Sequence, residues 1–372
     1  MPDNHITDAD PQHSSEETGL VREQSNAPAT VSRKRDHVEL VVNRDVAFRA
    51  KSAGFERLDF EHNAVPELNF ADVDSRSVFL GRTLSAPLMI SCMTGGYDEA
   101  EAINRALGAA CEQENIAMGV GSQRQALEND TFVESFRAAR RAAPSIPIVA
   151  NIGAAEVAAR LEIDHARKLV DMVEANALTV HLNPLQELLQ PEGNTKFAGV
   201  LAGIERLAAA LNVPIIAKEV GAGISAAAAQ RLLDVGVEWI DVAGAGGTSW
   251  AGVEILRRSN PELVDMFWDW GIPTVDCLIE MNELRQSRAF GLVGSGGLTS
   301  GLDLAKTIRL GADLGAAARP FVRALKTKGE AALLAEIRAW KYQLRAAMFL
   351  TGSATLEELS RAECRLVDAG KQ

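Results

Sequence analysis

The chain has 372 residues, of which 47% are hydrophobic and 24% are charged, enough apolar material for one large domain with a packed core. Its 50 acidic and 38 basic residues give a formal net charge of −12, which argues against nucleic acid or an anionic membrane as a partner. An anionic ligand would therefore need a local cluster of basic side chains.

The first 31 residues contain six acidic side chains, one basic side chain and almost no large apolar residues, which predicts a disordered acidic tail. This segment lacks the apolar stretch of a signal peptide, and no run of about 18 apolar residues predicts a membrane span. The cysteines are scattered and form no C-x-x-C pair. We interpret them as reduced thiols of a cytoplasmic protein: Cys92, Cys111, Cys277 and Cys364.

A basic cluster opens the segment 32–85, which precedes a repeating pattern that begins at residue 86. The cluster consists of Arg33, Lys34, Arg35 and His37. In the repeating pattern, eight short apolar runs fit strands that are buried on both faces of a parallel sheet. These runs are Pro87–Cys92, Ala117–Gly121, Pro147–Asn151, Ala177–Asn183, Pro214–Glu219, Trp239–Gly244, Phe290–Ser295 and Ala312–Ala317.

Helical patterns lie between these runs and predict amphipathic helices that cover the sheet. The patterns are Asp98–Asn115, a single helix over Ala155–Asn176, a helix from Pro273 through Arg285, and Leu302–Leu310, which Ser300 or Gly301 opens and Gly311 ends. In the second pattern, one stripe holds Leu161, His165, Leu169 and Met172.

Eight alternations of strand and helix predict a single-domain (β/α)8 TIM barrel over residues 86–320. A doubly wound sheet is an alternative that the pattern alone leaves open. Residues 321–372 have a strongly helical pattern, and we expect them to complete the domain by packing on the barrel or on a neighbouring subunit.

Polar residues and glycines follow nearly every predicted strand. Because active sites of such barrels lie at the carboxyl ends of the strands, these residues form one candidate site. In chain order they are Met93, Thr94, Gly95, Ser122, Gln123, Arg124, Asn151, His181, Asn183, Gln186, Glu187, Lys218, Thr248, Gly297, Leu298, Thr299, Ala318 and Arg319.

The glycine loops after the sixth and seventh runs indicate a phosphate site, because glycine lets backbone N–H groups approach a phosphate at a helix N-terminus. FMN and a phosphosugar substrate fit this layout equally well. Lys218 lies inside an apolar strand, where it either pairs with a carboxylate or faces an electron-rich cofactor ring. Glu187 is a candidate Mg²⁺ ligand, and the neutral Gln186 suits a hydrogen-bond relay. Since no conventional acid–base pair stands out, we expect a cofactor to carry the proton chemistry.

Several motifs together resemble the type 2 isopentenyl diphosphate isomerases over about Arg33–Leu359. They are Arg33-Lys34-x-x-His37, Met93-Thr94-Gly95-Gly96, Ser122-Gln123-Arg124, His181-Leu182-Asn183-Pro184-Leu185-Gln186-Glu187, Gly246-Gly247-Thr248-Ser249-Trp250 and Ser295-Gly296-Gly297. The resemblance implies interconversion of isopentenyl diphosphate and dimethylallyl diphosphate in isoprenoid biosynthesis. It also implies reduced FMN, NADPH as reductant, Mg²⁺, and a homotetramer or larger assembly.

The resemblance further implies roles for individual residues. The diphosphate would be held by Arg33, Lys34, His37 and Arg124, beside Ser122 and Gln123. Gln186 would contact the reacting alkene with His181 and Asn183 nearby, and Glu187 would bind Mg²⁺. FMN would be contacted by Met93, Thr94, Gly95, Ser122, Asn151, Lys218 and Thr248, with Gly297, Leu298, Thr299, Ala318 and Arg319 at its phosphate. Two departures remove a possible flavin contact: the family often has serine at Ala243 and a basic residue at Thr299.

Three other functions are compatible with a phosphate-binding barrel. An FMN-dependent 2-hydroxy-acid oxidase would want a histidine base after the seventh strand, where this chain has none. A nucleotide dehydrogenase of the IMP type would need a loop cysteine, whereas Cys277 falls within a predicted helix. A non-catalytic phosphate-ligand sensor would not need Gln186 and Glu187.

Overall fold

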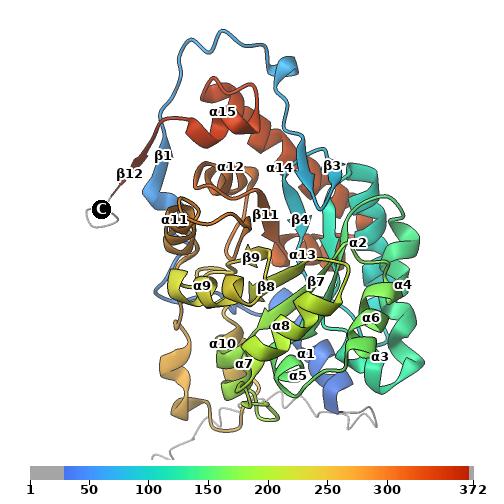
Figure 1. Cartoon of the computed structure of the whole chain (residues 1–372). Coiled ribbons are helices and arrows are strands. Elements are labelled where there is room, and N and C mark those ends of the chain that lie inside the picture. The colour runs from blue at the N-terminus through green and yellow to red at the C-terminus, as the bar shows by residue number, and fades with distance from the viewer. Residues whose placement is uncertain (1–28, 368–372) are drawn as a thin grey trace, which may run out of the picture.

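The computed structural model describes residues 29–367, and its centre is a closed barrel of eight parallel strands (Figure 1). The strands are β4 (Leu88–Ile90), β5 (Ala117–Gly119), β6 (Ile148–Gly153), β7 (Ala177–Leu182), β8 (Ile215–Glu219), β9 (Trp239–Asp241), β10 (Gly291–Ser295) and β11 (Leu314–Ala317). Their order around the barrel is β10-β11-β4-β5-β6-β7-β8-β9. The predicted (β/α)8 barrel is therefore confirmed, and the doubly wound sheet is excluded.

Helices surround this barrel, and further helices precede its first strand and follow its last strand along the chain. They are α1 (Ala29–Asn43), α2 (Ala100–Glu114), α3 (Arg124–Glu128), α4 (Val133–Ala142), α5 (Ala154–Ala158), α6 (Ile163–Met172), α7 (Pro184–Leu189), α8 (Val200–Ala210), α9 (Ala226–Asp234), α10 (Trp250–Ile255), α11 (Thr274–Leu284), α12 (Gly301–Arg309), α13 (Arg319–Lys328), α14 (Glu330–Leu350) and α15 (Leu356–Arg361). None of the helices in this described range is long and apolar enough to cross a membrane. In Figure 1, α1, α5, α7 and α10 gather at the lower end of the view, where the site lies.

Two predictions about helices hold in detail and one is wrong. Ser300 caps α12 by accepting a hydrogen bond from the Asp303 backbone N–H, and Gly311 follows the helix with a φ of 97°. The single helix predicted over Ala155–Asn176 is instead two helices, α5 and α6. The chain turns between them at Arg160, which has a φ of 64°, outside the range of a right-handed helix.

The stripe predicted on that helix is corrected accordingly. His165 is exposed, and α6 instead buries Ala166, Leu169 and Met172. This spacing follows the 3.6-residue period of a helix that starts at Ile163 rather than at residue 155.

The end of the barrel away from the site is sealed by a hairpin of β2 (Ser77–Phe79) and β3 (Arg82–Leu84). Its two-residue turn has positive φ at both Leu80 and Gly81, as the favoured hairpin turns require. Phe79 packs edge-to-face on Trp239 at the start of β9, with ring centroids 5.0 Å apart. These rings join the inward-facing strand side chains in one apolar cluster, so this end is closed.

The last elements of the described range pack on the outside of the barrel. Helix α14 lies against α2, α12 and α13 and buries Trp340. Strand β12 (Cys364–Leu366) pairs with β1 (Leu58–Phe60). The predicted acidic tail lies almost entirely outside the described residues, although α1 begins at Ala29, within its predicted span.

Candidate active site

Two adjoining chambers open at the carboxyl ends of the barrel strands. The polar chamber, with a volume of about 140 Å³, is lined by Arg33, Lys34, His37, Ser122, Arg124, Gln125, Asn151, Glu156, His181, Asn183, Gln186, Glu187 and Gln190. The glycine chamber, of about 410 Å³, is lined by Val41, Ala47, Ala243, Gly244, Gly246, Gly247, Thr248, Ser295, Gly296, Gly297, Leu298, Thr299, Ala318, Arg319 and others. Their shared wall consists of Cys92, Met93, Lys218, Val220 and Trp250. The site thus has one cationic compartment beside one backbone-lined compartment.

The glycine chamber is built by close packing of two loops. A Cβ on Gly247 would lie 2.6 Å from the Gly297 nitrogen, so the loops after β9 and β10 touch through their backbones. A third segment covers them, because Ser249 N–H donates to Val46 O at 2.7 Å. Helix α13 starts beside these loops, and its first residues, Arg319 and Pro320, line the chamber. Amide donors, a hydroxyl and a helix N-terminus form a donor set that fits the phosphate of FMN.

Replacing Gly246 by alanine is expected to impair flavin retention. Gly246 has a φ of 115°, and an added Cβ would lie 1.9 Å from the Ala53 nitrogen, so the loop must move. Strain of about 1–3 kcal/mol predicts an FMN dissociation constant raised roughly 10-fold or more, measured by titrating apoprotein. Gly81→Ala is the matched control, because Gly81 has a φ of 74° but open space around it. Equal FMN affinity in both variants would contradict this reading of the loop.

Two predicted phosphate contacts have other partners. Thr299 donates both its N–H and its hydroxyl to Asp303 Oδ2, at 2.9 Å each, so both donors already have a partner in the first turn of α12. Arg319 donates from Nε to Val41 O at 3.0 Å and from Nη2 to Arg44 O at 3.1 Å. Arg319 therefore anchors the end of α1 to the chamber wall.

Lys218 faces both chambers from strand β8. Its Nζ donates to Glu219 O at 2.6 Å, and no ion pair with a carboxylate is found for it among residues 29–367. Its neighbour in the sheet, Asp241, is fully buried and accepts a hydrogen bond from the Ser295 hydroxyl, and burial raises the pKa of that carboxyl group. Of the two interpretations of Lys218, the geometry favours the one in which it faces a ligand.

His181 projects from β7 into the polar chamber, and its Nδ1 lies 2.7 Å from Asn151 Oδ1. Because an amide oxygen can only accept, Nδ1 carries the proton. Burial lowers the pKa of His181 to about 4, so the imidazole is neutral near pH 7. A neutral His181 cannot serve as a cation for an anionic ligand.

Besides Lys218, the cations of the polar chamber come from α1 and from the start of α3. Lys34 Nζ donates to Gly95 O and to Ser122 O, at 2.8 Å each, and so ties α1 to two strand-end loops. Burial, together with the charges of Arg33 and Arg124, lowers the pKa of Lys34 to about 7. Arg124 Nη1 lies 3.0 Å from Glu156 Oε1, a carboxylate that an incoming anion must compete with.

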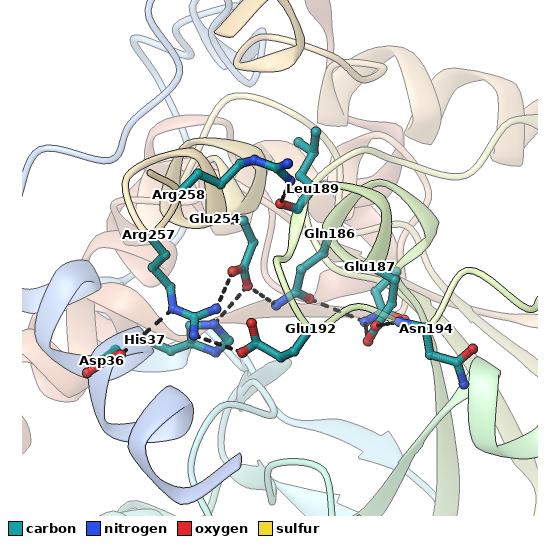
Figure 2. A network of polar contacts seen from close by, with 11 residues as sticks. Asp36, His37, Gln186, Glu187, Leu189, Glu192, Asn194, Glu254, Arg257 and Arg258 are labelled. Carbon is teal, nitrogen blue, oxygen red and sulfur yellow. Dashed lines mark hydrogen bonds and ion pairs between the residues drawn. The ribbon is translucent and has the colours of Figure 1, made fainter. Parts of the chain in front are cut away.

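Two side chains that line the polar chamber, Gln186 and His37, are held by Glu254, a residue that the sequence does not predict (Figure 2). This side chain of α10 is fully buried, and its Oε1 accepts from Gln186 Nε2 at 3.0 Å. His37 Nε2 lies 2.8 Å from the same oxygen, and the His37 ring meets Trp250 edge-on. Burial would raise the pKa of Glu254, but the contacts from His37, Gln186 and Arg257 outweigh burial and lower it to about 2. Because an ionised Glu254 can only accept hydrogen bonds, the Gln186 side chain must present its NH₂ group to this carboxylate.

Glu187 is held beside Gln186 with its carboxylate already oriented. Asn183 Nδ2 donates to Glu187 Oε1 at 3.0 Å, and Asn194 N–H donates to Oε2 at 2.7 Å. Among residues 29–367, no group of three or more His, Cys, Asp or Glu side chains could hold a metal ion by itself. Glu187 therefore fits a Mg²⁺ ion that takes most of its oxygen ligands from water and substrate phosphate.

Three residues that the sequence predicts as ligand contacts line neither chamber. Gln123 is fully buried and links Leu169 O to the Asn151 N–H, so it joins α6 to β6. The Thr94 hydroxyl bonds to Asn104 Oδ1, and Gly95 accepts from Lys34. These residues support the wall, whereas Glu156, Trp250 and Glu254 belong to the site without having been assigned to it. The only local signal for Glu254 is a carboxylate placed one helical turn after Trp250 in an apolar helix.

The barrel and its phosphate-type chamber are of a kind found in FMN-dependent enzymes. The FMN-dependent dehydrogenase family model matches residues 194–366. The fold is shared with a mandelate oxidase variant carrying a monooxide FMN adduct, with a TM-score of 0.62 at 17% identity over 88% of this chain and 95% of that chain. A lactate oxidase of Pediococcus acidilactici gives a TM-score of 0.63 at 15% identity, over 91% of this chain and 94% of that one.

Sequence comparison places the chain within this class. It is 48% identical to the isopentenyl-diphosphate delta-isomerase of Chlorobaculum parvum, over 91% of this chain and 98% of that protein. It is 50% identical to the enzyme of the same name from Chlorobium luteolum, over 89% of this chain and 94% of that protein. The chain belongs to the isopentenyl-diphosphate delta-isomerase family, in its FMN-dependent, type 2 form.

Proposed function

We propose that this protein interconverts isopentenyl diphosphate and dimethylallyl diphosphate, with reduced FMN in the glycine chamber and the diphosphate in the polar chamber. The observation that carries the proposal is the position of Gln186, which donates to the buried Glu254 and lines the polar chamber, the chamber that shares one wall with the glycine chamber. The reacting alkene would lie against that wall, between the amide and the cofactor. Reduced FMN supplies an electron-rich ring that can exchange a proton with the substrate, so no net oxidation is needed.

The protein residues would bind and orient the substrate. Arg33, His37 and Arg124 would make charge-assisted contacts with the diphosphate, which explains how an acidic protein binds a polyanion. Glu187 would bind Mg²⁺, and the metal would bridge to the diphosphate. Lys218 and Thr248 would contact FMN from the strand ends. The segment 32–85 would thus supply part of the substrate clamp.

The proposal is tested with the full chain. Purified protein is reconstituted with FMN, Mg²⁺ and NADPH, its visible spectrum is recorded, and conversion of isopentenyl diphosphate is followed with and without reductant. Conversion that requires reductant is the expected result, and omission of Mg²⁺ should abolish it. A flavin-loaded, reduced protein that leaves isopentenyl diphosphate unchanged would refute the proposal. Rapid anaerobic bleaching of the flavin by 2-hydroxy acids would favour an oxidase instead.

Substrate binding is expected to weaken as the pH rises above 7. Lys34 is protonated below its pKa of about 7 and loses its charge above it, so its attraction for diphosphate falls. Loss of one nearby charge predicts a KM that rises roughly 3- to 10-fold between pH 7 and pH 9. Lys34→Gln should show the higher KM already at pH 7 and a flatter profile. The same pH dependence in both proteins would assign the effect to another group.

We also propose a homotetramer or larger assembly in the cytoplasm. The large apolar side chains of Leu263, Met266 and Trp270 are more than half exposed, which supports self-association. None of the four cysteines forms a disulfide in the part of the chain that the structure describes, which supports a reducing compartment. Light scattering of purified protein tests the assembly, and a monomer at micromolar concentration would contradict it.

A further inference from the structure

We propose that Arg257 is a positioning residue. It holds Glu254 in the arrangement that orients Gln186, and it connects α1 and the loop after α7 to α10. The inference rests on the proposed function, because it concerns how the residues of the same site are held in position. Arg257 lies just beyond the end of α10 and lines neither chamber. It therefore acts only through other residues.

The Arg257 guanidinium bridges three segments of the chain (Figure 2). Nη1 lies 2.6 Å from Glu254 Oε2, Nη2 lies 2.8 Å from Glu192 Oε1, and Nε lies 3.8 Å from Asp36 Oδ2. The Arg257 side chain is only 13% exposed, so these contacts are partly shielded from water. A planar group with several fixed donors can make contacts of this kind at once, which a lysine cannot do.

Each bridged segment carries a functional side chain of the proposed site. Asp36 lies next to His37 on α1, the helix that brings Arg33 to the polar chamber. Glu192 lies in the loop whose Asn194 N–H holds the Glu187 carboxylate. Through these contacts, Arg257 links α1, which carries diphosphate contacts, with the loop that holds Glu187 and with Glu254, the partner of Gln186.

The effect on Gln186 follows from the charge of Glu254. The groups around this carboxylate are His37 and Arg33 on α1, the neutral Gln186 on α7, and Arg257 itself. Without Arg257, the fully buried carboxylate of Glu254 loses the cation that contacts its Oε2, and it gains stability by taking up a proton. A protonated Glu254 can donate a hydrogen bond, so the Gln186 amide is no longer restricted to presenting its NH₂ group on that side.

The neighbouring Arg258 provides a matched control. It leaves the same helix end, and its Nη1 donates to Leu189 O at 2.6 Å, so it also secures α7. It has no ion pair with Glu254 among the described residues. An effect seen in Arg257→Met but not in Arg258→Met would therefore come from the carboxylate network rather than from anchoring α7.

The experiment compares Arg257→Met, Arg257→Lys and Arg258→Met in the full-length, FMN-loaded protein. Arg257→Met is expected to lower kcat about 10- to 100-fold with flavin still bound, in the range typical of groups that orient a functional side chain. The loss should deepen as the pH falls, because Glu254 now titrates in the accessible range. Arg257→Lys should recover part of kcat, and Arg258→Met should stay near wild type. A pH profile of Arg257→Met that parallels wild type, or an equal loss in Arg258→Met, would overturn the proposal.

Two further measurements keep the test decisive. If Arg257→Met folds poorly, the loss of kcat caused by Arg257→Lys is compared in the wild-type protein and in Glu254→Gln. The proposal requires a smaller loss of kcat when the buried charge of Glu254 is absent, and an unchanged loss would refute it. Hydrogen exchange needs no turnover: amides of α1 and residues 190–194 should exchange faster in Arg257→Met than in Arg258→Met. This readout separates a failure of the network from a wild-type protein that lacks isomerase activity.

Discussion

Gln186→Ala is expected to lower kcat about 10²- to 10⁴-fold while FMN stays bound, since a positioned proton-transfer group contributes on this scale. The substitution removes the amide that Glu254 orients and leaves that carboxylate buried without one of its donors. KM should change much less than kcat, because the diphosphate contacts come from other residues. Initial rates at saturating substrate and the flavin absorbance spectrum give the two readouts.

Leu188→Ala is the control for this substitution. Leu188 lies on the same short helix and is 57% exposed, so its truncation perturbs α7 without touching the site. Rates near wild type in Gln186→Ala would remove the amide from the mechanism. Loss of flavin in Gln186→Ala would instead assign it a structural role.

Glu187→Gln is expected to raise the Mg²⁺ concentration needed for half-maximal rate by at least about 10-fold. The amide keeps the size of the side chain and one oxygen for Asn183 or Asn194, but it removes the negative charge that attracts the metal. Saturating Mg²⁺ should restore part of kcat. Rate against Mg²⁺ concentration at fixed substrate is the measurement.

Glu205→Gln serves as the matched control, because Glu205 is an exposed carboxylate on α8. It should leave the metal titration unchanged despite the same loss of charge from the protein. An identical Mg²⁺ titration in Glu187→Gln and wild type would rule out Glu187 as a ligand.

The barrel could be predicted from the sequence because its strands are buried on both faces and therefore appear as apolar runs. Each of the eight runs coincides with one observed strand, although β6 extends two residues beyond its run and β4, β5 and β9 are only three residues long. The break between α5 and α6 could not be predicted, since the turn at Arg160 uses a residue type that ordinarily favours a helix. Tertiary packing, rather than local preference, sets that turn.

The candidate site, like the fold, could be predicted from the sequence only in part. Residues after the strands could be grouped because parallel strands bring their carboxyl ends together. The direction of a side chain could not be read in the same way, so Gln123, next to Arg124, was assigned to the chamber although it points into the core. The role of Glu254 depends on a contact with Gln186 across 68 positions of the chain, which no local pattern reports.

The hairpin that places Phe79 at the far end of the barrel has a consequence for how the protein takes up its ligands. With that end of the barrel closed, both chambers are reached only from the carboxyl ends of the strands. Substrate and cofactor would then approach from the same face of the barrel, into adjoining chambers that share one wall. An occupied enzyme should accordingly retain its flavin longer than an idle one.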